Sequence, residues 1–230
     1  MLDPSRWEGG GRGRRAARAG TVGSVGRADH WNDRYGTTAE TSLSWFEESP
    51  AVSLGLFDEL GVTPRDSVVD VGGGASRLVD RLLERGHRDI AVLDVSAVAL
   101  RDARDRLGGA RGVDWIEHDL LTWEPRRRWT VWHDRAVLHF LVDDEDRSSY
   151  ARLLRRTVEP GGAFVIGGFA EDGPTHCSGL PVRRAGTEEL VDLLGDVEVV
   201  ARRRHVHRNP AGVDQPFDWL AGHLPADGRA

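Results

Sequence analysis

The stretch Val68–Ser76, with the sequence VVDVGGGAS, places an apolar run that carries one aspartate directly before three glycines. A short apolar run rich in valine is typical of a buried strand. Glycine permits positive φ angles and lets the backbone approach a ligand that a Cβ would block. The pattern therefore predicts a strand whose carboxyl end opens into a loop for a nicotinamide dinucleotide, a phosphate or another ligand.

Around this stretch, apolar strand candidates alternate with segments of helical periodicity. Such alternation implies right-handed crossovers and a doubly wound α/β fold, with a mainly parallel sheet and helices on both faces. Two adjacent strand candidates close the chain, which favours a terminal hairpin with one antiparallel strand. The predicted strands are 66–72, 90–95, 113–119, 129–137, 163–170, 197–207 and 215–222, and the predicted helices are 27–36, 49–61, 75–86, 96–109, 146–162 and 186–195.

The composition excludes several classes of protein. All 31 basic residues are arginine, and a chain without lysine can form neither a P-loop nor a pyridoxal phosphate Schiff base. Cys177 is the single cysteine, so an intrachain disulfide is impossible and we expect a reducing, cytoplasmic setting. No run approaches about 18 apolar residues, so we expect no membrane span.

The segment Gly9–Gly20 holds four arginines and no acidic residue among its glycines and alanines. This composition cannot bury a core, and it predicts a disordered tail over residues 1–27. A nucleic-acid-binding arm, a transit peptide and an over-extended start are the alternatives. Because the net charge is −6, we expect no nucleic-acid partner for the protein as a whole. One domain is expected over residues 28–224, followed by a short tail over 225–230.

The residues near the glycines discriminate between the candidate ligands. A dinucleotide fingerprint needs a third glycine where this chain has Arg77, so that fit is partial. A nucleoside joined to an amino-acid tail needs carboxylates at successive strand ends instead. Asp70 lies inside the first strand end, Asp94 ends the next strand 22 residues after Gly72, and Asp119 ends the third. At these positions Asp94 suits a ribose diol, and Asp119 suits the amino group of adenine.

VVDVGGGAS, followed by VLDVS and EHDLL, resembles the class I S-adenosylmethionine-dependent methyltransferases over roughly Asp29–Trp219. The family's glycine motif is D-x-G-x-G-x-G, and Ser76 stands here in place of the last glycine. The resemblance implies a Rossmann-like, seven-stranded sheet, with S-adenosylmethionine as cofactor, S-adenosylhomocysteine as product and no metal. It also implies contacts from Asp70, Gly72 and Gly74 to the methionine tail, from Asp94 to the ribose, and from Val95, Asp119 and Leu120 to the adenine.

The segment HWNDRYG resembles the opening of a methyltransferase subgroup with a Trp-x-x-x-Tyr pattern, matched here by Trp31 and Tyr35. In that subgroup the segment folds over the methionine end of the cofactor, where aromatic faces attract a sulfonium. Trp45 and Phe46 follow as candidates for a lid or an acceptor pocket. All four aromatic residues can equally anchor a helix to the core.

At the end of the predicted strand 129–137, the sequence VWHDRAVLHFL lacks the diproline loop of amine- and amide-methylating relatives. It therefore does not support methylation of a nucleobase or a glutamine. Because neutral histidine is a suitable general base, we hypothesise that His133 or His139 accepts a proton from an acceptor hydroxyl or thiol. Asp134 is a candidate to orient the histidine or contact the cofactor, and Arg135 to contact the substrate. Each histidine can equally be structural, since proximity and alignment can carry the rate.

The 16-residue loop Glu171–Gly186 is long enough to act as a binding loop. It carries Cys177, which is a candidate acceptor contact or simply a small buried residue. His205 and His207 would share one face of a strand, but no Cys or acid cluster accompanies them, so we expect no metal site.

The leading prediction is an enzyme that transfers a methyl group from S-adenosylmethionine to O or S of a small-molecule acceptor. A protein-lysine methyltransferase is the first alternative, because the Trp-x-x-x-Tyr opening also occurs in that group. A non-catalytic module that binds a nucleoside or RNA is the second alternative, and a nicotinamide oxidoreductase is the third.

Overall fold

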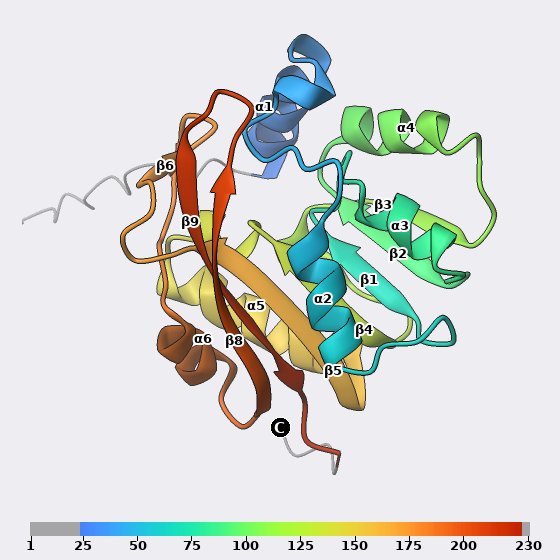
Figure 1. Ribbon diagram of the computed structural model, residues 1–230, viewed down its shortest axis with the longest axis vertical. Helices are drawn as coiled ribbons and strands as arrows, with labels where there is room; N and C mark the ends of the chain where they lie inside the picture. Colours follow the sequence, from blue (N-terminus) through green and yellow to red (C-terminus); the bar gives the residue numbers. More distant parts are fainter. Residues whose placement is uncertain (1–23, 227–230) are drawn as a thin grey trace, which may run out of the picture.

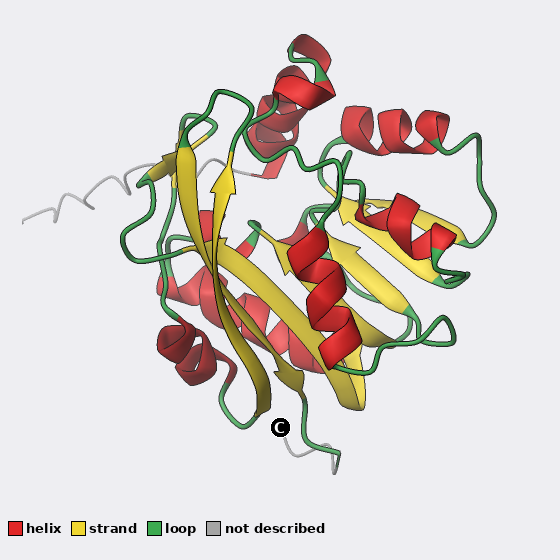
Figure 2. Cartoon of the chain, in the orientation of Figure 1, coloured by secondary structure: helices red, strands yellow, loops and turns green. Residues whose placement is uncertain are grey.

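In the computed structural model, which describes residues 24–226, seven strands form one sheet in the order β3-β2-β1-β4-β5-β9-β8 (Figures 1 and 2). The five strands β1 to β5 pair in parallel, and β9 pairs antiparallel with β5 and β8. The predicted sheet with one antiparallel strand is therefore confirmed. The strands are β1 (Val68–Val71), β2 (Ile90–Asp94), β3 (Val113–Glu117), β4 (Trp129–Arg135), β5 (Val158–Phe169), β8 (Glu198–Arg208) and β9 (Asp214–His223).

Helices cover both faces of the sheet, as the apolar character of its strands requires. Neighbouring residues of β4 show the alternation: Val131 packs with the core under α2, α3 and α4, and Trp132 packs with the core under α5 and α6. The helices are α1 (Ser24–Thr37), α2 (Ala51–Glu59), α3 (Leu78–Glu84), α4 (Ala97–Arg106), α5 (Asp144–Thr157) and α6 (Thr187–Leu194). None of the helices within residues 24–226 is long and apolar enough to cross a bilayer.

The predicted helix 146–162 is too long by five residues at its C-terminal end. α5 ends at Thr157, and β5 begins at once with Val158, whose backbone is extended. Val158 is fully buried and pairs with Trp129 of β4. Burial of this valine in the sheet therefore overrides the helical periodicity that precedes it.

α1 begins at Ser24, so residues 24–27, which the sequence assigned to a tail, are helical. The rest of the predicted tail lies outside the described residues. α1 packs on α4 above the carboxyl ends of the parallel strands (Figure 1). Asn32 fixes this contact, because its Oδ1 accepts hydrogen bonds from Ser96 Oγ at 2.8 Å and from the Val98 N–H at 3.2 Å.

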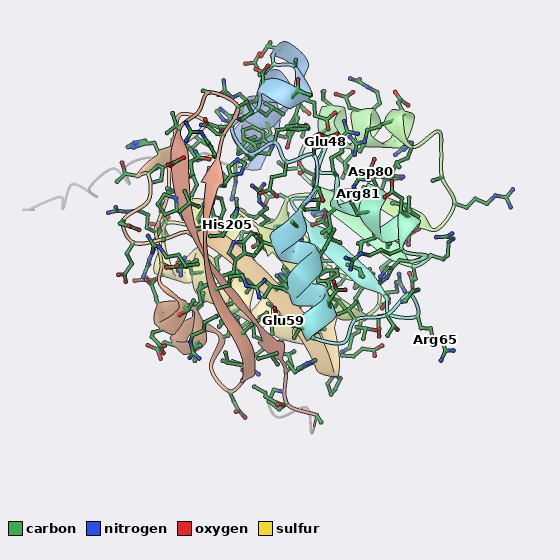
Figure 3. The ribbon with its side chains drawn as sticks, in the orientation of Figure 1. Glu48, Glu59, Arg65, Asp80, Arg81 and His205 are labelled. Atoms are coloured by element: carbon green, nitrogen blue, oxygen red, sulfur yellow. The ribbon has the colours of Figure 1, made fainter. Side chains whose placement is uncertain are left out.

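Polar contacts at the surface join α2 to β8 and the segment before α2 to α3; Figure 3 labels Glu48, Glu59 and Arg81, which take part in them. Glu59 at the end of α2 forms an ion pair with Arg203 of β8, and Arg81 of α3 donates to the carbonyl of Glu48 at 3.3 Å. Exposed pairs of this kind contribute only about 0–1 kcal/mol each. The position of this segment beside the sheet therefore depends mainly on buried α2 residues such as Leu56 and Phe57.

Candidate active site

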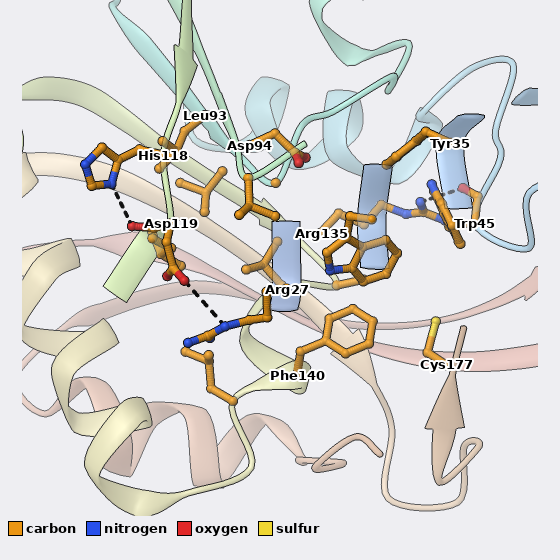
Figure 4. Close-up of a pocket in the computed structure, with 18 residues that line it drawn as sticks. Arg27, Tyr35, Trp45, Leu93, Asp94, His118, Asp119, Arg135, Phe140 and Cys177 are labelled. Atoms are coloured by element: carbon orange, nitrogen blue, oxygen red, sulfur yellow. Dashed lines mark hydrogen bonds and ion pairs between the residues drawn. The ribbon is translucent and has the colours of Figure 1, made fainter. Parts of the chain in front are cut away.

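A pocket opens at the carboxyl ends of β1, β2, β3 and β4, under α1 (Figure 4). Ligands bind at this edge in doubly wound sheets. Most of the residues that the sequence singled out meet here, although they come from segments far apart in the chain. Those that line the pocket are Trp31, Tyr35, Trp45, Gly72, Asp94, Val95, Asp119, Leu120, Arg135 and Cys177.

Gly74 lies beside this pocket, at a position where only glycine fits. Its φ angle is +43°, and a Cβ built there would lie 2.7 Å from Tyr35 Oη and 2.8 Å from Asp94 Oδ2. Real Cβ atoms do not approach other atoms so closely. Because Gly74 has no side chain, the Tyr35 hydroxyl and the Asp94 carboxylate both lie close to its backbone. This close approach to the backbone is what the glycine motif predicts.

Asp94 ends β2 as a buried carboxylate at the floor of the pocket. Its Oδ1 accepts the N–H of Ser96 at 2.8 Å. Burial raises the pKa of the Asp94 carboxyl to about 7, although backbone donors such as that N–H lower it. Burial also raises the pKa of the Tyr35 hydroxyl, and the Asp94 charge adds to that effect. Because Asp94 lines the pocket, its carboxylate can accept further hydrogen bonds from hydroxyl groups there.

At the other end of the pocket, Asp119 forms an ion pair that sequence reasoning missed. Its Oδ1 accepts the Leu121 N–H at 3.0 Å, and its Oδ2 lies 3.4 Å from Nε of Arg27 (Figure 4). Arg27 was predicted both as the end of the tail and as the first residue of the helix 27–36, and it stands four residues before Trp31 and eight before Tyr35. Residues at that spacing share one face of a helix, and this spacing was the signal that could have found it.

Four aromatic rings form a cluster on the covered side of the pocket. Trp31 is at its centre, with ring centroids 5.2 Å from Phe140, 5.6 Å from Trp45 and 6.4 Å from Tyr35. Most of these contacts are edge-to-face, a favourable geometry for aromatic pairs. The sequence predicted that Trp31 and Tyr35 cover the cofactor and that Trp45 belongs to a lid or an acceptor pocket. It did not predict Phe140, which lies on a short 3₁₀ helix after β4.

Arg135 closes the pocket beside Cys177. Its Nη1 donates to the carbonyl of Trp45 at 2.8 Å, and its Nη2 lies 3.1 Å from Oε1 of Glu47. Glu47 also lies 3.3 Å from Nδ1 of His207, a residue of β8. Burial lowers the pKa of the Arg135 guanidinium and raises the pKa of the Cys177 thiol. This network holds the segment that carries Trp45 against the sheet.

Six of the residues selected from the sequence do not line this pocket: Asp70, Gly74, Asp134, Phe46, His133 and His139. Phe46 borders a smaller neighbouring cavity. Asp134 points to the opposite face of the sheet, where its carboxylate accepts the Val137 N–H at 2.8 Å and the Tyr150 hydroxyl at 2.7 Å. Burial raises the pKa of Asp134 to about 6. Its carboxylate supports the loop after β4 and meets neither a histidine nor the pocket.

Neither candidate base faces the pocket. Both ring nitrogens of His133 already have partners, Asp70 Oδ1 at 2.7 Å and Ser53 Oγ at 2.8 Å. His139 is buried between Phe140 and Phe169, with centroid distances of 4.4 and 4.7 Å. Burial lowers the pKa of His139 to about 3. The expectation that these imidazoles reach an acceptor group therefore does not hold in this structure.

His205 is exposed on β8, while His207 is buried and its Nε2 lies 3.0 Å from the carbonyl of Ser44. Within residues 24–226, no three His, Cys, Asp or Glu side chains are grouped so that they could hold a metal ion.

Comparison with known proteins agrees with this geometry. Residues 68–162 match the family described as "Methyltransferase domain". The chain is 26% identical over 147 residues to the mouse (Mus musculus) eEF1A lysine and N-terminal methyltransferase, an alignment that covers 62% of this chain and 20% of the relative. The chain thus spans about a fifth of the length of that relative.

Two solved structures share the fold. One, from work on the conversion of a disulfide bond into a thioacetal group during echinomycin biosynthesis, has a TM-score of 0.69 and 18% identity, covering 87% of this chain and 94% of the other. The second is the N-methyltransferase NodS from Bradyrhizobium japonicum WM9 with S-adenosylhomocysteine, with a TM-score of 0.65, 15% identity, and coverage of 86% and 99%. Residues 68–162 of this chain thus match a methyltransferase domain, and the sheet order and the pocket with its glycine and buried carboxylate fit an S-adenosylmethionine-dependent methyltransferase.

Proposed function

We propose that this domain transfers the methyl group of S-adenosylmethionine to an O or S nucleophile of a small-molecule acceptor. The observation that carries the proposal is the pocket, which has a polar half at Asp94 and Asp119 and an aromatic half at Trp45 and Phe140. The domain proposed from the sequence, residues 28–224, contains every pocket residue except Arg27.

In this proposal the polar half holds the nucleoside. Asp94 would accept both ribose hydroxyls, since a carboxylate has acceptor sites on both of its oxygens. Val95 and Leu120 would flank the adenine, and Asp119 would accept its amino group beside Arg27. Gly72 and Gly74 would leave room for the methionine tail.

The cofactor supplies an electrophilic methyl group on a sulfonium, and the protein aligns the cofactor with the acceptor. Trp31 and Tyr35 present aromatic faces that attract a cation. Their rings, together with Trp45, exclude water from the transfer. Neither candidate base, His133 nor His139, lines the pocket, and His118, which does, has its Nδ1 3.0 Å from the carbonyl of Asp119 at the polar half. We therefore propose that alignment rather than proton abstraction provides most of the rate.

The acceptor would lie at the aromatic half, between Phe140, Arg135 and Cys177. Arg135 places a cation at this end, which disfavours an acceptor that arrives as an ammonium ion. A neutral or acidic molecule with a hydroxyl or thiol avoids that repulsion, and this chemical argument supports an O or S acceptor.

A protein lysine is the second candidate acceptor. Relatives named for eEF1A lysine methylation favour it, and a four-ring cluster can stabilise an alkylammonium by cation–π attraction. The two candidates differ in where transferred methyl groups are found, so one labelling experiment separates them.

The cofactor test is calorimetric titration of S-adenosylhomocysteine, beside NAD, on wild type and Asp94→Ala. We expect micromolar binding of S-adenosylhomocysteine, which Asp94→Ala weakens at least about tenfold, since hydrogen bonds to a charged group are among the stronger ones. The exposed Asp105 on α4 gives a matched control, Asp105→Ala, which should bind as wild type. Preference for NAD would overturn the proposal.

The acceptor test uses S-adenosylmethionine labelled on its methyl group, with a cell extract separated into small-molecule and protein fractions. Label in the small-molecule fraction that depends on Asp94 supports the first candidate. Label on a lysine in the protein fraction alone would replace it with the second.

A further inference from the structure

Beneath the glycine loop, Ser53, His133 and Asp70 form a hydrogen-bonded chain that the proposed reaction does not use. Ser53 Oγ lies 2.8 Å from His133 Nε2, and His133 Nδ1 lies 2.7 Å from Asp70 Oδ1. The three residues come from α2, β4 and β1. They are buried, with 1, 2 and 2% of their surface exposed.

The hydrogen bonding of this chain has one consistent direction. A carboxylate can only accept, so His133 Nδ1–H donates to Asp70. In the neutral imidazole Nε2 then has a lone pair, and the Ser53 hydroxyl donates to it. Asp70 thereby selects the tautomer of His133, and the Ser53 hydroxyl satisfies the ring nitrogen that remains.

The second oxygen of Asp70 faces the glycine loop. Oδ2 has no hydrogen-bond partner among the described residues, and it lies 2.5 Å from where a Cβ of Gly73 would be. The loop therefore rests directly on a carboxylate whose orientation the histidine sets. Asp70 does not line the pocket, but Gly72, its neighbour along the chain, does.

A buried pair of this kind is not explained by stability. Replacing buried polar pairs with apolar residues is often neutral or stabilising. The surroundings of His133 are apolar enough for such a replacement, with Phe57 edge-on at 5.8 Å and Trp219 at 6.5 Å between ring centroids.

The order Ser–His–Asp is also that of a hydrolase triad. Here the serine is 1% exposed and lies in the first turn of α2, and Ser53 and His133 border only the small cavity that Phe46 also lines, so the arrangement is not built to receive an acyl substrate. These hydrogen bonds therefore orient Asp70 and do not activate Ser53 as a nucleophile.

We infer that His133, fixed by Ser53, is a positioning residue that orients the Asp70 carboxylate beneath the glycine loop and so keeps that loop in the shape that binds the cofactor. This inference rests on the cofactor half of the proposed function and is independent of the acceptor.

The test measures S-adenosylhomocysteine affinity and thermal unfolding for His133→Leu, His133→Asn and Ser53→Ala. We expect His133→Leu to weaken binding at least about tenfold. His133→Asn, which keeps a donor near the Nδ1 position, should recover most of that loss. Ser53→Ala should weaken binding by about two- to fivefold. The control His87→Leu removes another buried histidine, one that does not contact Asp70, and should bind as wild type.

Binding by folded His133→Leu within twofold of wild type would overturn the inference. So would equal losses in His133→Leu and His133→Asn, because they would indicate packing alone. If His133→Leu does not fold, Ser53→Ala decides, and unchanged affinity overturns the inference. A wild type that binds S-adenosylhomocysteine but methylates no O or S acceptor refutes only the acceptor in the proposed function. A wild type that does not bind it refutes the cofactor assignment itself.

Discussion

The hydroxyl of Tyr35 and the carboxylate of Asp94 meet across Gly74, at 2.7 and 2.8 Å from the point where a Cβ would stand. Tyr35 belongs to the helix that covers the pocket, and Asp94 belongs to the sheet beneath it. Helix α1 above the pocket and strand β2 beneath it therefore approach each other at Gly74, which has no side chain.

Gly74→Ala should weaken S-adenosylhomocysteine binding at least about tenfold, because the methyl group would displace Tyr35 or Asp94 and φ would remain in a region costly for alanine. Calorimetric titration measures the loss. The control is Gly36→Ala, where a Cβ meets nothing within 4 Å. Equal affinities for the two variants would contradict the role assigned to Gly74.

Cofactor affinity should rise with pH through about 7, the pKa of Asp94. Below that pH the protonated carboxyl loses acceptor capacity for the ribose hydroxyls. Titration with S-adenosylhomocysteine at pH 6, 7 and 8 checks this, and Asp94→Asn should lose the pH dependence. Retention of the same pH profile by Asp94→Asn would assign it to another group.

The same carboxyl should make the ligand-free protein less stable as pH rises from about 4 to 7. Its pKa is higher in the folded state than the ordinary aspartate value of 3.8, so the folded state binds the proton more tightly and loses that advantage as pH approaches 7. Asp94→Asn should therefore unfold at a higher temperature than wild type at pH 8, with a smaller difference at pH 4. A Tm difference independent of pH would count against this account.

Arg27→Ala should weaken S-adenosylhomocysteine binding about three- to tenfold, because it removes the ion pair that ties α1 to Asp119. The comparison variant is Arg101→Ala, which removes an exposed arginine of α4. Limited proteolysis should cleave the α1 region faster in Arg27→Ala alone. Identical proteolysis of both variants would show that the pair does not hold the cover.

His139→Phe should retain methyl transfer within about threefold of wild type and keep the shape of its pH profile. The imidazole is buried between aromatic rings, and neither ring nitrogen has a hydrogen-bond partner among the described residues. Initial rates from pH 6 to 9 measure this. Loss of one limb of the profile would restore His139 as the base.

The sequence by itself determined the sheet and the polar half of the pocket. Asp94 and Asp119 both follow apolar strands, and parallel strands bring their carboxyl ends to one edge. These two residues therefore lie at the same edge of the sheet as Gly72, whatever the order of the parallel strands. Serine is a favoured N-cap residue, and Ser96 caps α4 in the structure, where its Oγ accepts the Ala99 N–H at 3.2 Å.

The tertiary structure alone decided which way β4 faces and what covers the pocket. Successive strand residues point to opposite faces, and the pairing of β4 with β1 sets His133 beside Asp70. That register turns His133 toward α2 and Asp134 toward α5, so two adjacent candidates leave the pocket in opposite directions. Arg27 enters it because α1 packs across the strand ends, a contact made by residues distant in sequence. Alternation along a strand is a local property, but the face that becomes buried under a given helix depends on the whole packed sheet.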